Sequence, residues 1–202
     1  MKEKVYRRFE SQVRGRLTPA RFFHACAVRD CAGELAEKNG GSRAEAELAG
    51  FLHDYARDLP GAELLRLGEE RGLIKNEVER FVPVLLHGPV GAELVREELG
   101  IKNTGVLKAI AHHTLGAPGM GLLEKVVYVA DLTAEGRNYP GVDHLRELAR
   151  KDLEEALLVG FAFSIRSCLE RQKLIHPQTI AAWNFFLAQR KSLKQQVELI
   201  PG

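Results

Sequence analysis

The pair His53-Asp54 closes an apolar run, Leu48 to Leu52, and restricts the fold of this chain more than any other feature. Helical spacing places His53 on the same face as the small residues Ala46 and Ala49, where neighbouring helices can approach closely. Ionisable side chains are rarely buried without a partner, because removing a charge from water is costly. A divalent metal would be such a partner, and it would need further ligands from elsewhere in the chain.

An ordered series of histidine and aspartate residues supplies these candidates across about half of the chain. They are His24, His53-Asp54, His87, His113 and Asp131. Helical spacing puts most of them on apolar faces; Asp131, for example, follows Val127 by four residues. Each residue alone has an ordinary structural explanation as a core histidine, a helix cap or a turn residue. Together they indicate a metal site, because one cation would offset the cost of burying all of them.

The types of ligand narrow the choice of metal. Imidazole and carboxylate groups favour iron, manganese, cobalt, nickel or zinc over calcium. Six candidate ligands are more than a single ion with open positions needs. Two ions that share a bridging carboxylate are therefore an alternative to one ion, and Asp54 is the bridging candidate. His112 is rotated by about 100° from His113, so we expect it nearer the rim of the site.

Composition limits the classes to which this chain can belong. Its 202 residues are 45% hydrophobic and 28% charged, which is ordinary for one globular domain. The formal net charge of +2 gives no strong attraction to nucleic acid or to a membrane. The chain opens without a signal peptide, and no apolar run approaches the ~20 residues of a membrane span, so we expect a cytoplasmic protein. An odd number of cysteines argues against a disulfide framework: Cys26, Cys31 and Cys168 are expected to be small buried residues.

The pattern along the chain is helical almost throughout, and no segment has convincing strand periodicity. Thr18-Pro19, Ser42 with Glu45, and Asp152 with Glu155 are typical helix starts. Helices are expected over 18–38, 42–54, 60–72, 76–86, 89–100, 103–114, 122–132, 143–150, 152–172 and 177–191. His87-Gly88-Pro89 is expected to be a turn. The sequence therefore predicts an all-α protein with a basic N-terminal extension (1–16), one helical domain (17–191) and a frayed C-terminal tail (192–202).

Two groups of residues have open roles. The basic run of Lys2, Lys4, Arg7, Arg8, Arg14 and Arg16 is more typical of a solvated helix face than of a nucleic-acid-binding arm. The aromatic residues Trp183, Phe185 and Phe186 are expected in the core of the last helix, with contact to a nucleobase as the alternative.

Several longer motifs carry a resemblance that extends over about residues 17–187. They are Thr18-Pro19-Ala20-Arg21-Phe22-Phe23-His24, Leu52-His53-Asp54-Tyr55-Ala56-Arg57-Asp58-Leu59-Pro60, Leu86-His87-Gly88-Pro89-Val90-Gly91-Ala92, His113-Thr114, Ala130-Asp131, Gly136-Arg137 and Ile175-His176-Pro177-Gln178-Thr179. In these motifs the chain resembles the HD-domain phosphohydrolase superfamily. It is most similar to the YqeK family, described as symmetrical bis(5′-nucleosyl)-tetraphosphatases.

The resemblance implies an HD-domain helical bundle that holds an iron-type metal centre of one or two ions, with manganese or cobalt as alternatives. The substrate that it implies is diadenosine tetraphosphate, cleaved to two ADP by metal-activated hydroxide that attacks an inner phosphorus. The metal ligands that it implies are His24, His53, Asp54 and Asp131. Asp54, His87 and His113 are the implied catalytic residues, the two histidines acting on the substrate phosphate or holding a second metal. The implied substrate-binding residues are Arg57, Asp58, His87, His113, Arg137 and His176.

Some positions depart from the family pattern. His112 stands where an aromatic residue is usual, and Thr133-Ala134-Glu135 replaces a common Ile-Glu-Pro. The resemblance puts these positions at the pocket rim, so what it implies about nucleobase selectivity, rather than about the chemistry, does not carry over to this chain. Two other readings remain: a different HD-type nucleotide phosphohydrolase or phosphodiesterase, and a non-catalytic nucleotide-binding domain. The expected partner is a small-molecule nucleotide, not a membrane or nucleic acid, and a homodimer is left open.

Overall fold

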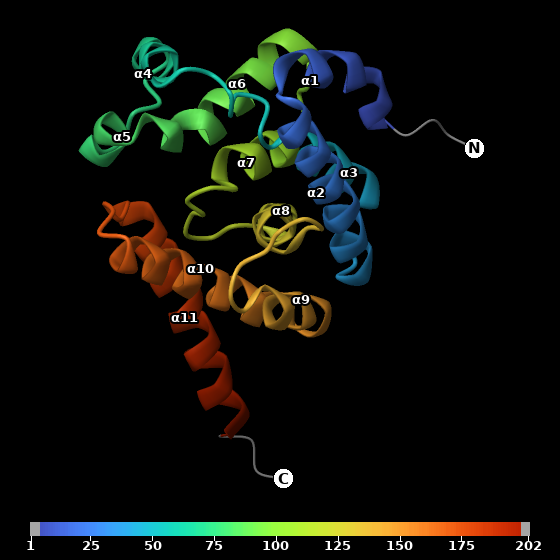
Figure 1. Ribbon diagram of the computed structural model, residues 1–202. Coiled ribbons are helices and arrows are strands. Elements are labelled where there is room, and N and C mark those ends of the chain that lie inside the picture. Colours follow the sequence, from blue (N-terminus) through green and yellow to red (C-terminus); the bar gives the residue numbers. More distant parts are fainter. Residues whose placement is uncertain (1–4, 199–202) are drawn as a thin grey trace.

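The computed structural model describes residues 5–198, and within this range the secondary structure is entirely helical (Figure 1). The elements in chain order are η1 (Val5–Phe9), α1 (Glu10–Arg16), α2 (Pro19–Lys38), α3 (Arg43–Leu52), α4 (Gly61–Glu70), α5 (Glu77–Phe81), η2 (Pro83–Leu86), α6 (His87–Leu99), α7 (Thr104–His112), α8 (Leu122–Thr133), α9 (Val142–Lys151), α10 (Leu153–Glu170) and α11 (Pro177–Glu198). The predicted all-α class is confirmed. In the same range, no helix has the length and apolar character needed to cross a membrane.

Helix α8 is the centre of the bundle. Figure 1 shows it nearly end-on, with α7 above, α2 and α3 to one side, and α9 and α10 below; contacts join α8 to all five helices. Every residue from Val126 to Ala130 is buried, as expected for a helix segment surrounded by others. Val127 belongs to the hydrophobic core shared with α3, α6 and α7, whereas Val126 and Val129 belong to the core shared with α9 and α10. Asp131 therefore lies near the end of the most enclosed helix.

The close pairing of α2 with α3 depends on a glycine. A Cβ atom at Gly50 would lie 3.0 Å from the carbonyl oxygen of Val28 and 3.1 Å from the Cα of Arg29. Any larger side chain would push the two helices apart. Because α2 carries His24 and α3 leads into His53, this contact also sets the separation of two predicted ligands.

Three predictions about helix ends need correction. Ser42 caps α3 through its hydroxyl, but Glu45 does not complete a capping box, because its side chain accepts a hydrogen bond from Asn103 instead. The helix expected over 76–86 is split into α5 and η2 by Pro83, which has no N–H to donate. His87-Gly88-Pro89 is the first turn of α6 rather than a separate turn, because proline is compatible with the first turn of a helix.

Both chain ends contain more helix than expected from the sequence. Tyr6, Phe9 and Val13 from η1 and α1 are buried in the main core, so the basic extension packs on the domain through its apolar side. Helix α11 ends at Glu198, beyond the helix end expected near Lys191. Lys2 and Lys4 of the basic run, and residues 199–202 of the tail, lie outside the described residues. The domain boundaries at 17 and 191 stay predictions.

The three cysteines are free thiols, as expected, but they are half-buried rather than fully buried. The aromatic residues of α11 are divided between two environments. Phe186 is buried in the core with Phe161, whereas Phe185 is 36% exposed. The expectation of a core role is therefore correct for Phe186 and only partly so for its neighbour.

Candidate metal centre

Five helices bring the predicted ligands to one place. Histidine and aspartate side chains converge from the second turn of α2, the end of α3, the start of α6, the end of α7 and the last part of α8: His24, His53, Asp54, His87, His113 and Asp131. Two triads within this set have ligand atoms that all lie within 4.8 Å of one another. One comprises His24, His53 and Asp131, and the other His53, Asp54 and His113. The structure thus brings together residues that are separated by up to 107 positions in the sequence.

Three of the histidines are oriented by the same local device. Each stands at a helix boundary, and its Nδ1 lies within hydrogen-bonding distance of the carbonyl oxygen three residues earlier. The distances are 2.7 Å from His53 to Gly50, 2.5 Å from His87 to Val84 and 2.8 Å from His113 to Ile110. A carbonyl oxygen only accepts, so in each neutral ring Nδ1 carries the proton and Nε2 offers a lone pair. All three lone pairs are directed into the cluster.

The two oxygen atoms of Asp54 face different histidines. Oδ2 lies 3.5 Å from Nε2 of His53, whereas Oδ1 lies 3.2 Å from Nε2 of His87 and 3.7 Å from Nε2 of His113. On the first side, Oδ1 of Asp131 is 2.8 Å from Nε2 of His24 and 3.7 Å from Nε2 of His53. Asp54 therefore joins two groups of ligands, as expected for the predicted bridging carboxylate.

The contacts within the cluster are incomplete without a cation. Nε2 of His53 is fully buried and has no hydrogen-bond partner among the described residues. The Nε2 atoms of His87 and His113 are 2.9 Å apart, so two lone pairs face each other unless a proton or a metal lies between them. Thr114 contributes one hydroxyl, at 3.2 Å and 3.1 Å from these two atoms. The donor set consists of imidazole and carboxylate groups and fits a divalent transition metal.

At His53, Asp54 and Asp131 the electrostatics favour the protonation states that metal binding requires. Burial lowers the pKa of His53 to about 4, so its ring is neutral at pH 7. Burial alone would raise the pKa of Asp54, but the neighbouring imidazoles, His53 first, outweigh it and hold that pKa far below its usual range. The same opposition holds for Asp131, whose pKa is kept low by His24, His53 and Arg137. Metals bind ionised carboxylates and neutral imidazoles.

The pKa values of His87 and His113 are shifted in opposite directions. Burial lowers the pKa of His87. Burial acts in the same direction on His113, but there the contacts with Asp54 prevail and raise the pKa. Of the two rings, His113 therefore takes up a proton more readily than His87.

Two arginines border the cluster, and one of them was missed by the sequence reasoning. Arg137 donates a hydrogen bond to Oδ1 of Asp131, and its guanidinium lies 3.1 Å from Nε2 of His24. Arg21, which was not predicted, donates to Asp58 at 2.5 Å and lies 3.5 Å from Oδ2 of Asp54. Its position one helical turn before His24 is the sequence signal that would have revealed it.

The other predicted site residues lie farther from this centre or act indirectly. Asp58 accepts hydrogen bonds from Arg21 and from the backbone N–H of Thr18, so it fixes the start of α2. Arg57 is half-buried, and burial and the charge of Arg21 lower its pKa. His112 is at the rim, as expected, where its Nδ1 is 2.6 Å from Glu124.

His176 has a separate environment. Its ring is buried, its Nε2 lies 3.6 Å from Oε1 of Glu79, and its Nδ1 accepts the N–H of Gln178 at 3.1 Å. The neighbouring Thr179 donates to the carbonyl of Leu115, just beyond His113. This segment therefore supports the loop after α7, whereas the imidazole itself faces α5.

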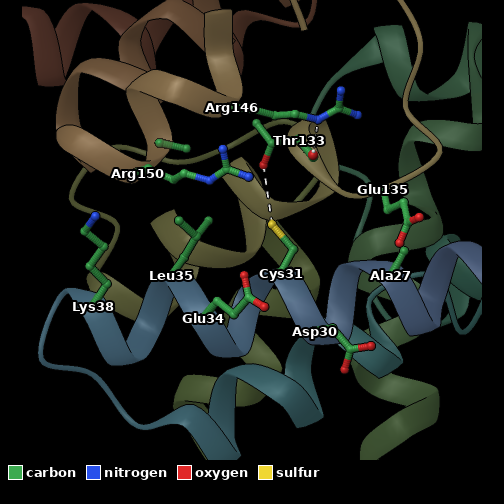
Figure 2. A pocket seen from close by; sticks show the side chains of 11 residues that line it. Ala27, Asp30, Cys31, Glu34, Leu35, Lys38, Thr133, Glu135, Arg146 and Arg150 are labelled. Atoms are coloured by element: carbon green, nitrogen blue, oxygen red, sulfur yellow. Dashed lines mark hydrogen bonds between the residues drawn. The ribbon is translucent and has the colours of Figure 1, made fainter. Parts of the chain in front are cut away.

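The loop after α8 is held by an arginine from α9. Arg146 donates hydrogen bonds to the backbone carbonyls of Thr133 at 3.0 Å, Ala134 at 3.2 Å and Arg137 at 2.7 Å. Figure 2 shows its side chain beside Thr133. Arg146, Thr133 and Cys31 all line a hollow of about 540 Å³. Arg146 thus positions the backbone of the residue that contacts Asp131.

With the site described, the class of protein is clear. A family model described as HD domain matches residues 21–136, which include all six clustered ligands. The chain belongs to the HD domain family. This confirms the resemblance inferred from the sequence motifs.

The relatives identify a narrower group. A Bacillus subtilis protein named bis(5′-nucleosyl)-tetraphosphatase, symmetrical, is 37% identical over 176 residues, covering 87% of this chain and 94% of that protein. A protein of the same name from Halalkalibacterium halodurans is 37% identical over 179 residues, covering 89% of this chain and 95% of that protein. A crystal structure from Clostridium acetobutylicum, described as a predicted HD superfamily hydrolase involved in NAD metabolism, has a TM-score of 0.88 and 34% identity, and covers 92% of this chain and 98% of that chain.

Proposed function

We propose that this protein is a metal-dependent hydrolase that cleaves diadenosine tetraphosphate symmetrically to two ADP. The observation that carries the proposal is the buried, unpartnered Nε2 of His53, which lies among ligand atoms of two triads. The names of the relatives supply the substrate and the position of cleavage. The alternatives, another HD-type nucleotide phosphohydrolase or a non-catalytic nucleotide-binding domain, receive less support, because the whole predicted ligand set is retained and assembled.

The centre is proposed to hold two ions, with iron as the proposed metal and manganese or cobalt as substitutes. His24, His53 and Asp131 would hold one ion with Oδ2 of Asp54, and His87 and His113 would hold the other with Oδ1 of Asp54. When bound, such ions make a hydroxide nucleophile available near neutral pH and neutralise charge on the phosphate under attack.

The protein's own side chains would place the substrate. Arg137 lies at the edge of the cluster, and its guanidinium can form paired hydrogen bonds with a phosphate in exchange for its contact with Asp131. Arg21 and Arg57 add positive charge on the same side, and Asp58 keeps Arg21 in place. The role of His176 in substrate binding stays a prediction. A homodimer stays an open alternative, and the cytoplasmic location stays a prediction.

Product analysis tests this function. Metal-loaded protein incubated with diadenosine tetraphosphate should give ADP as the only product. ATP together with AMP would show asymmetric cleavage and contradict the proposal. A preparation that fails to turn over this substrate with iron, manganese or cobalt, yet binds ADP, would favour the nucleotide-binding domain.

Elemental analysis tests the two-ion arrangement separately. Wild-type protein should contain about two metal equivalents, and His87→Ala should contain about one, because only the ligand group on Oδ1 of Asp54 is damaged. A matched control is His144→Ala, since that histidine lies on α9 and lines a different hollow, beside Tyr139 and Phe163. One equivalent in both wild type and His87→Ala would show a single-ion centre.

A further inference from the structure

A hollow of about 680 Å³ adjoins the metal centre, between the first turns of α2 and the loop after α8. In Figure 1 this loop passes from α8 towards α2 before it turns down into α9. His24 lines the hollow and also belongs to the ligand cluster, so the hollow opens directly onto the centre. Its volume is within the range of about 300–1,000 Å³ typical of small-molecule sites.

Phe23 lines this hollow and is 71% exposed. A single exposed phenylalanine on a convex surface needs no explanation. Here, however, the ring lies in a concave region whose other lining side chains are mostly polar, and it immediately precedes a predicted metal ligand. An aromatic ring in such a place offers a flat apolar face on which a nucleobase can stack.

The charges around the hollow indicate how a nucleotide would lie in it. Arg21 and Arg137 line the hollow, and both also contact the carboxylates of the metal centre. Glu135, also in the lining, is the acidic residue of the loop after α8. Phosphate groups are therefore favoured beside the two arginines and the metal centre, and an uncharged base is favoured against the apolar ring of Phe23.

We propose that Phe23 is the nucleobase-stacking residue of a substrate subsite in this hollow. One ADP half of the substrate lies there, with its base against the phenyl ring and its phosphates directed towards Arg21, Arg137 and the metal centre. The proposal rests on the proposed function for the identity of the nucleotide. For Phe186 it replaces the alternative that this residue of α11 contacts the base, because Phe186 is buried in the core.

Paired binding measurements test the role of Phe23. Dissociation constants for ADP and for inorganic pyrophosphate are measured by calorimetry on manganese-loaded wild type, Phe23→Ala and Phe23→Tyr. Loss of one stacked base should weaken ADP binding to Phe23→Ala by roughly 5- to 100-fold, with pyrophosphate binding unchanged. Phe23→Tyr keeps an aromatic face and should retain the affinity of the wild type. The control is Leu169→Ala, which removes an apolar side chain that is 64% exposed on α10.

The outcomes separate this proposal from the proposed function. Equal affinities of wild type and Phe23→Ala for ADP, or a parallel loss of pyrophosphate binding, would overturn the stacking role while leaving the hydrolase assignment intact. A wild type that cleaves no diadenosine tetraphosphate but shows Phe23-dependent ADP binding would overturn the function and keep the subsite. The exposed ring of Phe23 could instead form a subunit contact, which sedimentation of the same variants tests. Dissociation of an oligomer in Phe23→Ala, without loss of ADP affinity, would assign the ring to that contact.

Discussion

Asp54→Asn should abolish metal-dependent stabilisation while leaving the helical domain folded. The change preserves the shape of the side chain and removes its negative charge. Oδ1 and Oδ2 of Asp54 lie 3.2 Å and 3.5 Å from Nε2 atoms of His87 and His53, so the substitution affects both ligand groups at once. The hydrophobic contacts of α3, which end at Leu52, are left in place.

The size of the effect follows from ligand linkage. A metal present at about 1,000 times its dissociation constant stabilises the folded state by about 4 kcal/mol. For a chain of this length, each kcal/mol corresponds to about 2–4 °C in Tm. Each of the two proposed ions should therefore add about 8–16 °C, so wild-type protein should gain about 16–32 °C on full loading, and Asp54→Asn should gain less than about 2 °C.

Differential scanning calorimetry with and without a chelator measures this gain for each variant. Comparing the gain, rather than the absolute Tm, cancels any effect of the substitution on the metal-free protein. Asp30→Asn is the matched control, because that carboxylate is exposed on α2 and pairs with the adjacent Arg29. A full wild-type gain in Asp54→Asn would refute the assignment of this carboxylate to the metal centre.

Three further predictions follow from other contacts. Gly88→Ala should cost about 1–3 kcal/mol, read as a lower Tm, because its Cβ would lie 2.8 Å from the carbonyl oxygen of Ala111; an unchanged Tm would show that α6 and α7 can separate freely. Arg146→Met should raise KM for diadenosine tetraphosphate several-fold at constant metal content, since the loop that carries Arg137 loses three hydrogen bonds; loss of metal would instead show a role in the centre itself. The pKa of Asp58 is lowered, because the hydrogen bonds from Thr18 and Arg21 outweigh the effect of burial. The ionised carboxylate therefore stabilises the protein above its unfolded pKa of about 3.9, and this stabilisation is lost as pH falls through its folded pKa. In chelated protein the Tm difference between wild type and Asp58→Asn should therefore shrink as pH falls below the unfolded pKa of about 3.9, and a constant difference would contradict this.

Much of the fold and the metal centre could be predicted from sequence, because local rules governed them. Apolar periodicity and capping residues located the helices, and α2 and α8 begin and end within one or two residues of the expected positions. The candidate ligands could be named because a buried His or Asp on an apolar face is costly without a partner. Their convergence needed no knowledge of the helix packing.

What the sequence could not show depended on contacts between distant segments. The contact of Glu45 with Asn103 replaced a local capping box, and no local pattern encodes a partner 58 residues away. His176 looked equivalent to the other motif histidines, but its environment is set by Glu79 on α5. The role of Arg146 could not be predicted, because it binds backbone carbonyls of the loop after α8, and hydrophobic periodicity does not predict where a loop lies.

His53, His87 and His113 each form a hydrogen bond with the carbonyl oxygen three residues earlier, and this bond fixes the direction of the ring without a metal. Each ring is aimed by its own helix end, within four residues of chain, rather than by the ion. The apoprotein is consequently preorganised, and metal uptake should need no refolding and proceed at a rate set by encounter and dehydration. A histidine placed just after a helix, with its Nδ1 bonded to the carbonyl oxygen three residues earlier, could be used in design to place a metal ligand at the end of another helix.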